Sequence, residues 1–239
     1  ILAVLLCAAA VLAVRYLNNK NEPPGKQEAS DPRSSLSIAD SSPEIIPDYC
    51  GEDVIELNEG APCFNEYDIK TFAGESYSDL DGLGRCGTAM ALLNRDMMPE
   101  GPREPIGDIR PTGWIQAKYP GIVDSDPPYL YNRCHLVAYA MTGQNANELN
   151  LITGTRYMNA TTMLAYEEIV LEYLDGTDNH VLYRESPYFK EYELLARGVE
   201  IEAYSVEDKG WGVSFHVFIY NVQPGVEIDY QTGESRLAP

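Results

Sequence analysis

The sequence predicts an α+β domain in which a central antiparallel sheet packs against flanking helices. Two observations support this fold class. One segment carries apolar residues at helical spacing over about twenty positions, and three later segments are rich in β-branched and aromatic residues and are bounded by turn signals. Strand-like segments on both sides of one strong helix are typical of an α+β domain.

The strongest helix is expected from about Thr155 to Leu174. Its buried face is supplied by apolar side chains three to four residues apart, which recur once per helical turn. Asp175 and Gly176 then end the helix, because glycine commonly follows the last helical turn. The apolar positions are Met158, Leu164, Ile169, Val170 and Tyr173.

Three strands should follow, at His180–Tyr188, Val199–Val206 and Val213–Val222. In the third, apolar and more polar side chains alternate, which gives the strand two different faces. The short connections favour an antiparallel meander, and Val226–Tyr230 is a further candidate edge strand.

The region before the helix gives weaker signals. The spacing of apolar residues predicts a helix over Gly87–Asn94, although glycines interrupt it. Pro99 to Gly113 is rich in turn residues, and Gly143 to Asn150 is polar and is expected to form a loop. Leu136–Ala140 suits either a short strand or the turn that leaves one.

The N-terminal region divides into two parts before the domain. Residues 1–16, apolar up to Val14, are expected to be a signal peptide or a signal anchor truncated at its start. No convincing small-residue cleavage site follows, which favours an anchor with the domain outside the cytoplasm. Residues 17–47 are polar and proline-rich, which predicts a flexible linker. The folded domain is expected over residues 48–239, with its fold starting near Tyr49, or by Phe64 at the latest.

The charge of the chain argues against non-specific attraction to nucleic acid. The formal net charge is −20; residues 1–47 hold four cations and five acids, so −19 falls on residues 48–239. Summed negative charge repels a polyanion at long range. A nuclease with this charge would therefore need one local cationic site and a divalent metal ion.

The chain has five cysteines, which is compatible with a location outside the cytoplasm. Cys7 lies in the apolar segment, and a Cys50–Cys63 bond and a Cys86–Cys134 bond are candidate disulfides, although sequence alone does not fix connectivity. No CxxC pair or histidine-rich spacing indicates a zinc site.

The residues that point to chemistry centre on His135. Hydrolysis of a phosphodiester needs a base, a cation that offsets charge on the phosphate, and groups that hold the phosphate in line. Histidine is the natural base near neutral pH, and Arg133 lies two residues before His135. Asn159 and Glu167 follow on the predicted helix, and their oxygens are hard ligands suited to Mg²⁺.

These motifs resemble those of a known family. The segment Asn132-Arg133-Cys134-His135-Leu136 looks like the Asp-Arg-Gly-His signature of the DNA/RNA non-specific endonucleases, the ββα-metal nucleases. The segment Asn150–Asn159 is similar to the family stretch that leads into its metal-binding asparagine. The resemblance runs from about Asp79 to Glu234. Within the family, it is strongest to the streptococcal-type secreted and DNA-entry nucleases.

The resemblance implies a role for each matching residue. His135 would be the general base, Asn159 the direct Mg²⁺ ligand, and Arg133 the arginine beside the scissile phosphate. Glu167 would orient metal-bound water, with the adjacent Glu168 as an alternative. It also implies Mg²⁺ as cofactor, with Mn²⁺ as a substitute, and 5′-phosphate products from DNA and/or RNA with contacts to the backbone.

Two positions depart from the family pattern. Asn132 replaces its aspartate, and Cys134 replaces its glycine, which would be strained if that position required a positive φ. These departures and the acidic surface leave an alternative open, a catalytically inactive extracellular binding module of the same fold. An enzyme acting on a smaller phosphodiester is a third hypothesis.

Arginines outside the His135 segment are further candidate phosphate contacts. Arg156 and Arg184 are candidate substrate-binding residues, because a guanidinium suits phosphate oxygens; a surface ion pair is the favoured interpretation for Arg110. His180 and His216 are interpreted as structural. The N-terminal segment would contact a membrane if it is not cleaved, and nothing in the sequence indicates a protein partner.

Overall fold

The computed structural model describes residues 46–239, and Asp48–Pro239 form one compact unit. The expected signal segment and nearly all of the expected linker lie outside the described residues. Among the described residues, no helix is both long and apolar enough to cross a membrane.

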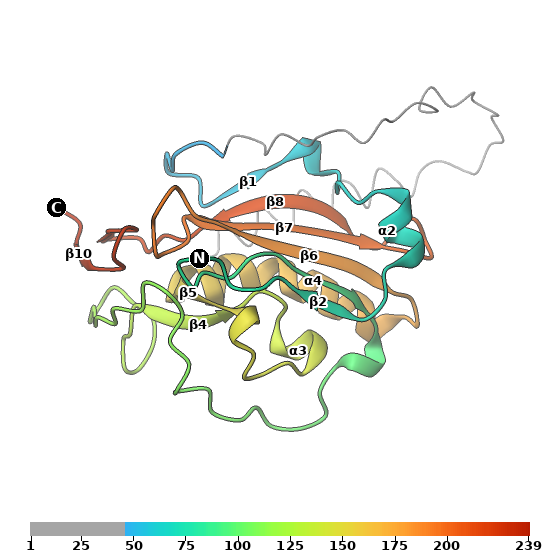
Figure 1. The fold of residues 1–239 in the computed structure, drawn as a ribbon, viewed down its shortest axis with the longest axis horizontal. Coiled ribbons are helices and arrows are strands. Elements are labelled where there is room, and N and C mark those ends of the chain that lie inside the picture. The colour runs from blue at the N-terminus through green and yellow to red at the C-terminus, as the bar shows by residue number, and fades with distance from the viewer. Residues whose placement is uncertain (1–45) are drawn as a thin grey trace. The chain divides into compact units, whose positions relative to one another are not determined.

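Six antiparallel strands form the main sheet, in the order β1-β8-β7-β6-β3-β2 (Figure 1). Its centre is the meander of β6 (Val181–Tyr188), β7 (Gly198–Ser205) and β8 (Ser214–Tyr220), which confirms the three strands predicted from the sequence. The remaining members are β1 (Val54–Glu56), β2 (Glu75–Tyr77) and β3 (Ala89–Leu93).

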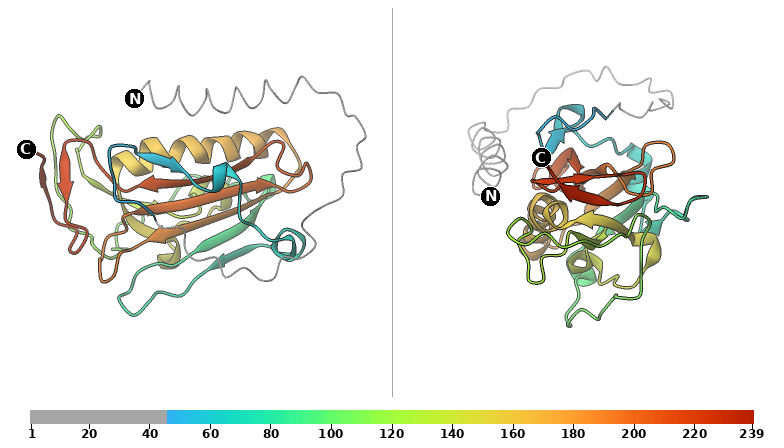
Figure 2. Two further views of the ribbon diagram at one scale, coloured as in Figure 1. Left: turned by 90° about the horizontal axis from the view of Figure 1, so that it is seen from above. Right: turned by 90° about the vertical axis from the view of Figure 1, so that its left-hand side faces the viewer.

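The two faces of this sheet differ in chemistry, because successive side chains of a strand point to opposite sides. On β7, Val199, Ile201 and Ala203 belong to the main hydrophobic core, whereas Glu200 and Glu202 alternate with them. The core face is covered by α4 (Met163–Gly176), which runs along the strands in the left-hand view of Figure 2. Several of its apolar side chains join the same core, namely Met163, Val170 and Leu174.

The helix predicted over Gly87–Asn94 is wrong. This segment forms strand β3, which pairs with both β2 and β6. Ala89, Ala91 and Leu93 are fully buried and alternate with partly exposed neighbours. That period of two is the signature of a strand. Within this short segment it outweighs the helical spacing of apolar residues in the longer surrounding stretch.

The segment that carries the sequence motifs forms a hairpin followed by a helix. Strand β4 (Tyr131–His135) pairs antiparallel with β5 (Leu151–Thr155), and His135 lies opposite Leu151. A π-helical turn, η4 (Met158–Thr162), then leads into α4, which ends at Gly176 as predicted. The chain turns immediately after His135 and forms α3 (Tyr139–Thr142), so the turn is the correct alternative for Leu136–Ala140.

The remaining elements are short. Strand β9 (Val226–Ile228), expected as an edge of the main sheet, instead pairs with β10 (Ser235–Leu237) in a separate two-stranded sheet. The other helical segments are α2 (Glu66–Thr71), η1 (Asn58–Gly60), η2 (Arg95–Met97) and η3 (Glu148–Asn150).

The disulfides suggested for Cys50–Cys63 and Cys86–Cys134 are not formed, since all four cysteines are thiols. The Sγ of Cys86 donates hydrogen bonds to the carbonyls of Glu148 and Leu151, both at 3.1 Å. Cys134 is fully buried, and its Sγ lies 3.3 Å from the Sδ of Met163. Each buried thiol therefore has its own environment.

Candidate active site

His135 ends strand β4 and is almost entirely buried, with 5% of its surface exposed. Its Nε2 lies 2.9 Å from the carbonyl oxygen of Asn145. Because a carbonyl can only accept a hydrogen bond, Nε2 carries the proton and Nδ1 presents its lone pair. The guanidinium of Arg103 donates to that Nδ1 at 3.1 Å.

These contacts keep His135 neutral. Burial lowers its pKa to about 4, and the charge of Arg103 acts in the same direction, while the Asn145 carbonyl partly opposes them. An imidazole with this pKa is unprotonated at neutral pH and can accept a proton at Nδ1. His135 can therefore act as a general base once a water molecule replaces Arg103 at Nδ1.

The loop around His135 is fixed by asparagines that the sequence reasoning did not single out. The side chain of Asn150 is fully buried; its Oδ1 accepts from the Val137 amide at 2.8 Å and its Nδ2 donates to the Val137 carbonyl at 2.9 Å. Asn145 accepts from Arg103 Nε at 3.0 Å through its Oδ1. These bonds hold the turn after β4 and the loop before β5 around the imidazole.

The π-helical turn changes the relation between Asn159 and Glu167. In a regular α-helix, residues eight positions apart are offset by about 80° around the axis. A π-turn accommodates one additional residue, which lowers this offset to about 20°. Asn159 lies within η4 and Glu167 within α4, so the turn brings both onto one side of the helix.

Glu167 is partly buried, whereas the adjacent Glu168 is exposed. Burial raises the pKa of Glu167 to about 7, and the charge of Glu168 adds to this effect. Beneath it in the sheet, Glu185 is fully buried and accepts a hydrogen bond from Tyr183 at 2.8 Å. The pKa of Glu185 is also raised, by burial and then by Glu167. Two neighbouring carboxyls therefore share an environment that lacks compensating positive charge.

Cys134 occupies its family-variant position without backbone strain. It lies within β4 and is not among the residues with positive φ. Gly154 on the facing strand makes room for its side chain, because a Cβ at Gly154 would approach Cys134 Cβ to 2.8 Å. The larger residue on one strand is thus matched by glycine on the other.

Arg133 lies on β4 two residues before His135, and its guanidinium ties down the loop that precedes the strand. It donates to the carbonyls of Ile109 and Gly107, and it stacks on Trp114 with 4.3 Å between Cζ and the ring centre. Burial lowers its pKa, followed by the neighbouring charge of Arg110. The guanidinium groups of Arg133 and Arg110 therefore lie close together.

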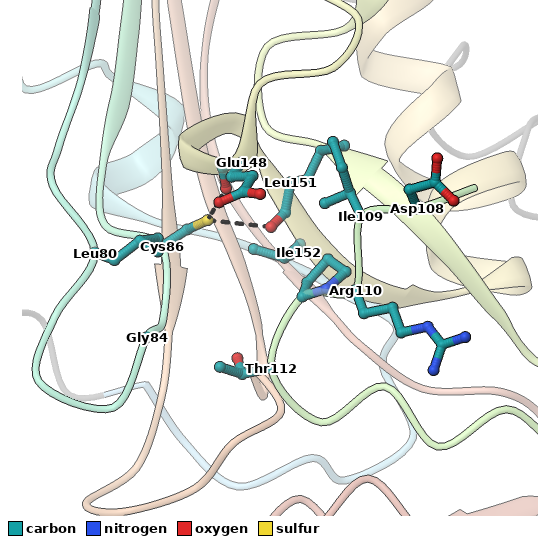
Figure 3. A pocket seen from close by; sticks show the side chains of 11 residues that line it. Leu80, Gly84, Cys86, Asp108, Ile109, Arg110, Thr112, Glu148, Leu151 and Ile152 are labelled. Atoms are coloured by element: carbon teal, nitrogen blue, oxygen red, sulfur yellow. Dashed lines mark hydrogen bonds between the residues drawn. The ribbon is translucent and has the colours of Figure 1, made fainter. Parts of the chain in front are cut away.

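Arg110 lines a pocket between this loop and strand β5 (Figure 3). Cys86 lies on one side of the pocket, and Figure 3 shows Arg110 extending away from that thiol. Thr112, Leu151 and Ile152 complete the surroundings. The surface ion pair expected for Arg110 is not formed within residues 46–239, and its guanidinium lies near that of Arg133.

A family model described as DNA/RNA non-specific endonuclease matches residues 65–207 of the chain. The chain belongs to this family. A curated deoxyribonuclease from Streptococcus dysgalactiae subsp. equisimilis is 26% identical over 196 residues, which cover 66% of the chain and 59% of that protein. The chain thus spans somewhat less than two thirds of the length of this relative.

Solved structures of nucleases share the fold. NucA from Streptococcus agalactiae with a magnesium ion bound is 26% identical, with a TM-score of 0.67 over 77% of this chain and 88% of that one. The Sda1 nuclease with a bound zinc ion is 25% identical, with a TM-score of 0.65 over 78% and 97%. The predicted ββα-metal nuclease fold is therefore confirmed, and β4, β5 and the helix η4–α4 form its ββα unit.

The residues of this chain fit a hard divalent cation at the helix. Asn159 offers an amide oxygen and Glu167 a carboxylate on the same side of η4 and α4. The Oε1 atom of Glu185 is buried and, within residues 46–239, has no hydrogen-bond partner. A site with few protein ligands suits Mg²⁺, which keeps several of its waters.

The structure does not bring all the predicted site residues together. Arg156 is partly exposed at the start of the helix, three residues before Asn159. Arg184 lies elsewhere: it alternates with the core residues Tyr183 and Glu185 on β6, so it points to the opposite face of the sheet. There its guanidinium binds Glu202, with Nε donating to Oε1 at 2.7 Å. This ion pair gives Arg184 a structural role on the face away from α4, and its role in substrate binding stays a prediction.

Proposed function

We propose that this chain is a Mg²⁺-dependent endonuclease that hydrolyses phosphodiester bonds of DNA and/or RNA and leaves 5′-phosphates. The observation that carries this proposal is the neutral imidazole of His135, whose Nδ1 presents a lone pair at the end of β4. A family membership alone would be compatible with an inactive domain, whereas a base held in the correct tautomer supports catalysis.

In the proposed reaction, His135 Nδ1 removes a proton from the water molecule that attacks phosphorus. The Asn145 carbonyl, which accepts from Nε2, stabilises the imidazolium that forms. Arg103 leaves Nδ1 when substrate and water enter, and its positive charge then faces the phosphate. Arg133 and Arg110 supply further positive charge against the non-bridging oxygens.

Asn159 would hold the metal ion directly, and Glu167 would bind or orient its water. When bound, Mg²⁺ would supply the positive charge that stabilises the pentacovalent phosphate and the departing 3′-oxygen. Mn²⁺ has similar oxygen preferences and is expected to substitute. Glu167 is the better candidate than Glu168, because it is partly buried beside Glu185 while Glu168 is exposed.

We further propose that the domain acts outside the cytoplasm, secreted or held at the membrane by its N-terminal segment. The apolar run of residues 1–14 supports this location. The domain charge of −19 means that binding should depend on local arginines and metal, with little non-specific retention on nucleic acid.

The test is cleavage of plasmid DNA and of a structured RNA by the purified domain, with Mg²⁺, with Mn²⁺ and with chelator, followed by analysis of product ends. The proposal predicts cleavage with either ion, none with chelator, and 5′-phosphate ends. Asn159→Ala should abolish cleavage, and His180→Ala, an exposed histidine paired with Glu207, should not.

An inactive binding module would cut neither polymer under any metal, even where a mobility-shift assay detected binding of nucleic acid. An enzyme for small phosphodiesters would hydrolyse a chromogenic diester and leave both polymers intact. Either outcome would overturn the proposed function.

A further inference from the structure

A second group of metal-binding side chains lies on the opposite face of the main sheet from α4. His216 on β8 and Glu202 on β7 are directly paired across the two strands. Cys63, from the segment that follows η1, lies over both: its amide donates to Glu202 Oε2 at 2.6 Å. One potential ligand atom from each of these three residues lies within 4.8 Å of the others.

The separations suit a tetrahedral ion. The Sγ of Cys63 lies 3.7 Å from Nδ1 of His216. Two such ligands at ordinary zinc distances and a tetrahedral angle would be about 3.6 Å apart. Only small adjustments of the side chains are therefore needed to place one ion between these two atoms.

The surroundings orient the ligands as they do in known zinc sites. The Nε2 of His216 lies 2.7 Å from Glu200 Oε1, so a proton on Nε2 directs Nδ1 toward Cys63. A carboxylate behind a ligating histidine fixes its tautomer and raises its basicity. Asn58 Nδ2 also donates to Cys63 Sγ at 3.5 Å, which favours the thiolate.

The charge balance favours a divalent ion. Glu200, Glu202 and a Cys63 thiolate would carry three negative charges, and Arg184, which is bound to Glu202, carries one positive charge. One divalent cation makes the group neutral.

We propose that Cys63, Glu202 and His216 form a binding site for one Zn²⁺ ion, separate from the Mg²⁺ site at Asn159. A thiolate and an imidazole select zinc over magnesium. Cys63 is exposed, so water can complete the coordination and the ion can enter from solvent. The ion would fasten the segment around Cys63 to strands β7 and β8 and thereby stabilise the domain.

The test is titration of the metal-free, reduced protein with Zn²⁺ by calorimetry, and with Co²⁺ by absorption spectroscopy. Both use the Asn159→Ala background, so that the Mg²⁺ site does not contribute. The proposal predicts one Zn²⁺ per chain, a thiolate-to-Co²⁺ charge-transfer band, and a rise in melting temperature with Zn²⁺. Cys63→Ser should weaken Zn²⁺ binding at least tenfold and remove the band.

The matched control is Cys50→Ser, which removes another exposed cysteine and should leave binding unchanged. His216→Asn should also lose the site; should this variant fail to fold, Cys63→Ser, on an exposed segment, still decides. Zinc binding that survives Cys63→Ser, a Co²⁺ spectrum without a sulfur band, or no Zn²⁺ binding at all would each overturn the proposal. Because Mg²⁺-dependent cleavage is measured separately, its failure would leave these results interpretable.

Discussion

His135 and His216 have nearly the same burial, with 5% and 3% of their surfaces exposed, yet their pKa values shift in opposite directions. For His135, burial lowers the pKa to about 4, and Arg103 adds to the effect. For His216, burial also lowers the pKa, but the hydrogen bond to Glu200 and the charges of Glu202 and Glu200 raise it overall. Neighbouring charge, and not depth, decides which histidine can serve as a base.

The same contrast holds for the two faces of the sheet. On the face opposite α4, acids have partners: Glu202 binds Arg184, and Glu200 binds His216. On the α4 face, burial raises the pKa of both Glu167 and Glu185, and the charge of Glu167 raises that of Glu185 further. One oxygen of Glu185 also lacks a hydrogen-bond partner among the described residues. Satisfied ion pairs are typical of structural sites, whereas uncompensated buried acids indicate a functional one.

The largest effect should come from His135. In His135→Ala, cleavage of plasmid DNA with Mg²⁺ should fall roughly 10²–10⁴-fold, the usual contribution of a general base. His180→Ala should cleave at the rate of the unaltered protein in the same gel assay. Equal loss in both variants, or undiminished cutting by His135→Ala, would contradict the distinction drawn between the histidines.

The next effect concerns the two adjacent glutamates. Glu167→Gln should raise the Mg²⁺ concentration needed for half-maximal cleavage about 10–100-fold, as expected when a group around the metal is altered. Glu168→Gln should change it little, since that side chain is exposed. Metal titrations of both variants make this comparison, and the reverse ranking would assign the role to Glu168.

Substitutions of Arg184 and of Arg156 should separate an effect on stability from an effect on substrate binding. Arg184→Ala leaves the buried Glu202 carboxylate without its cation and should lower the free energy of unfolding by about 2–4 kcal/mol, somewhat less than for a fully buried pair. Arg156→Ala should instead raise KM for DNA with little change in stability. Urea unfolding and steady-state kinetics measure the two effects; a raised KM for Arg184→Ala without destabilisation would support its predicted role in binding.

The smallest expected effect is a shift in pH dependence. The charge of Arg103 lowers the pKa of His135, so Arg103→Ala should raise that pKa and move the acid limb of the cleavage rate toward higher pH. The expected shift is up to about one unit. Arg95→Ala, which removes an exposed ion pair with Asp175, is the control. A shift toward lower pH would show that Arg103 acts otherwise.

Much of the fold could be predicted from the sequence, because α4 and strands β6, β7 and β8 are long and strongly periodic. Strand β3 could not be recognised from helical spacing, since it has only five residues and follows a glycine-rich stretch. The alternation of Ala89, Ala91 and Leu93 was the signal that could have identified it. The face of the sheet on which Arg184 lies could not be predicted from the sequence either, because it depends on which face of β6 packs against α4.

The candidate site was predicted in outline. The order of His135, Asn159 and Glu167 reflects a local hairpin and helix, which short-range spacing can reveal. Arg103 and Asn145 reach His135 from irregular loops, whose paths no periodicity encodes, and Asn150 holds the neighbouring Val137. The group of Cys63, Glu202 and His216 is assembled across strands from positions far apart in the chain, so no metal-binding spacing marks it.

The most direct test of this account is a pH titration of the histidine side chains by ¹H–¹⁵N NMR, because the chain contains only three histidines. His135 should remain neutral with its proton on Nε2 from pH 8 down to about pH 5, and should titrate near pH 4. His216 should remain protonated to a higher pH than an ordinary histidine. A His135 imidazole that titrates at or above about 6.5, the ordinary value, or that carries its proton on Nδ1, would contradict its assignment as the base.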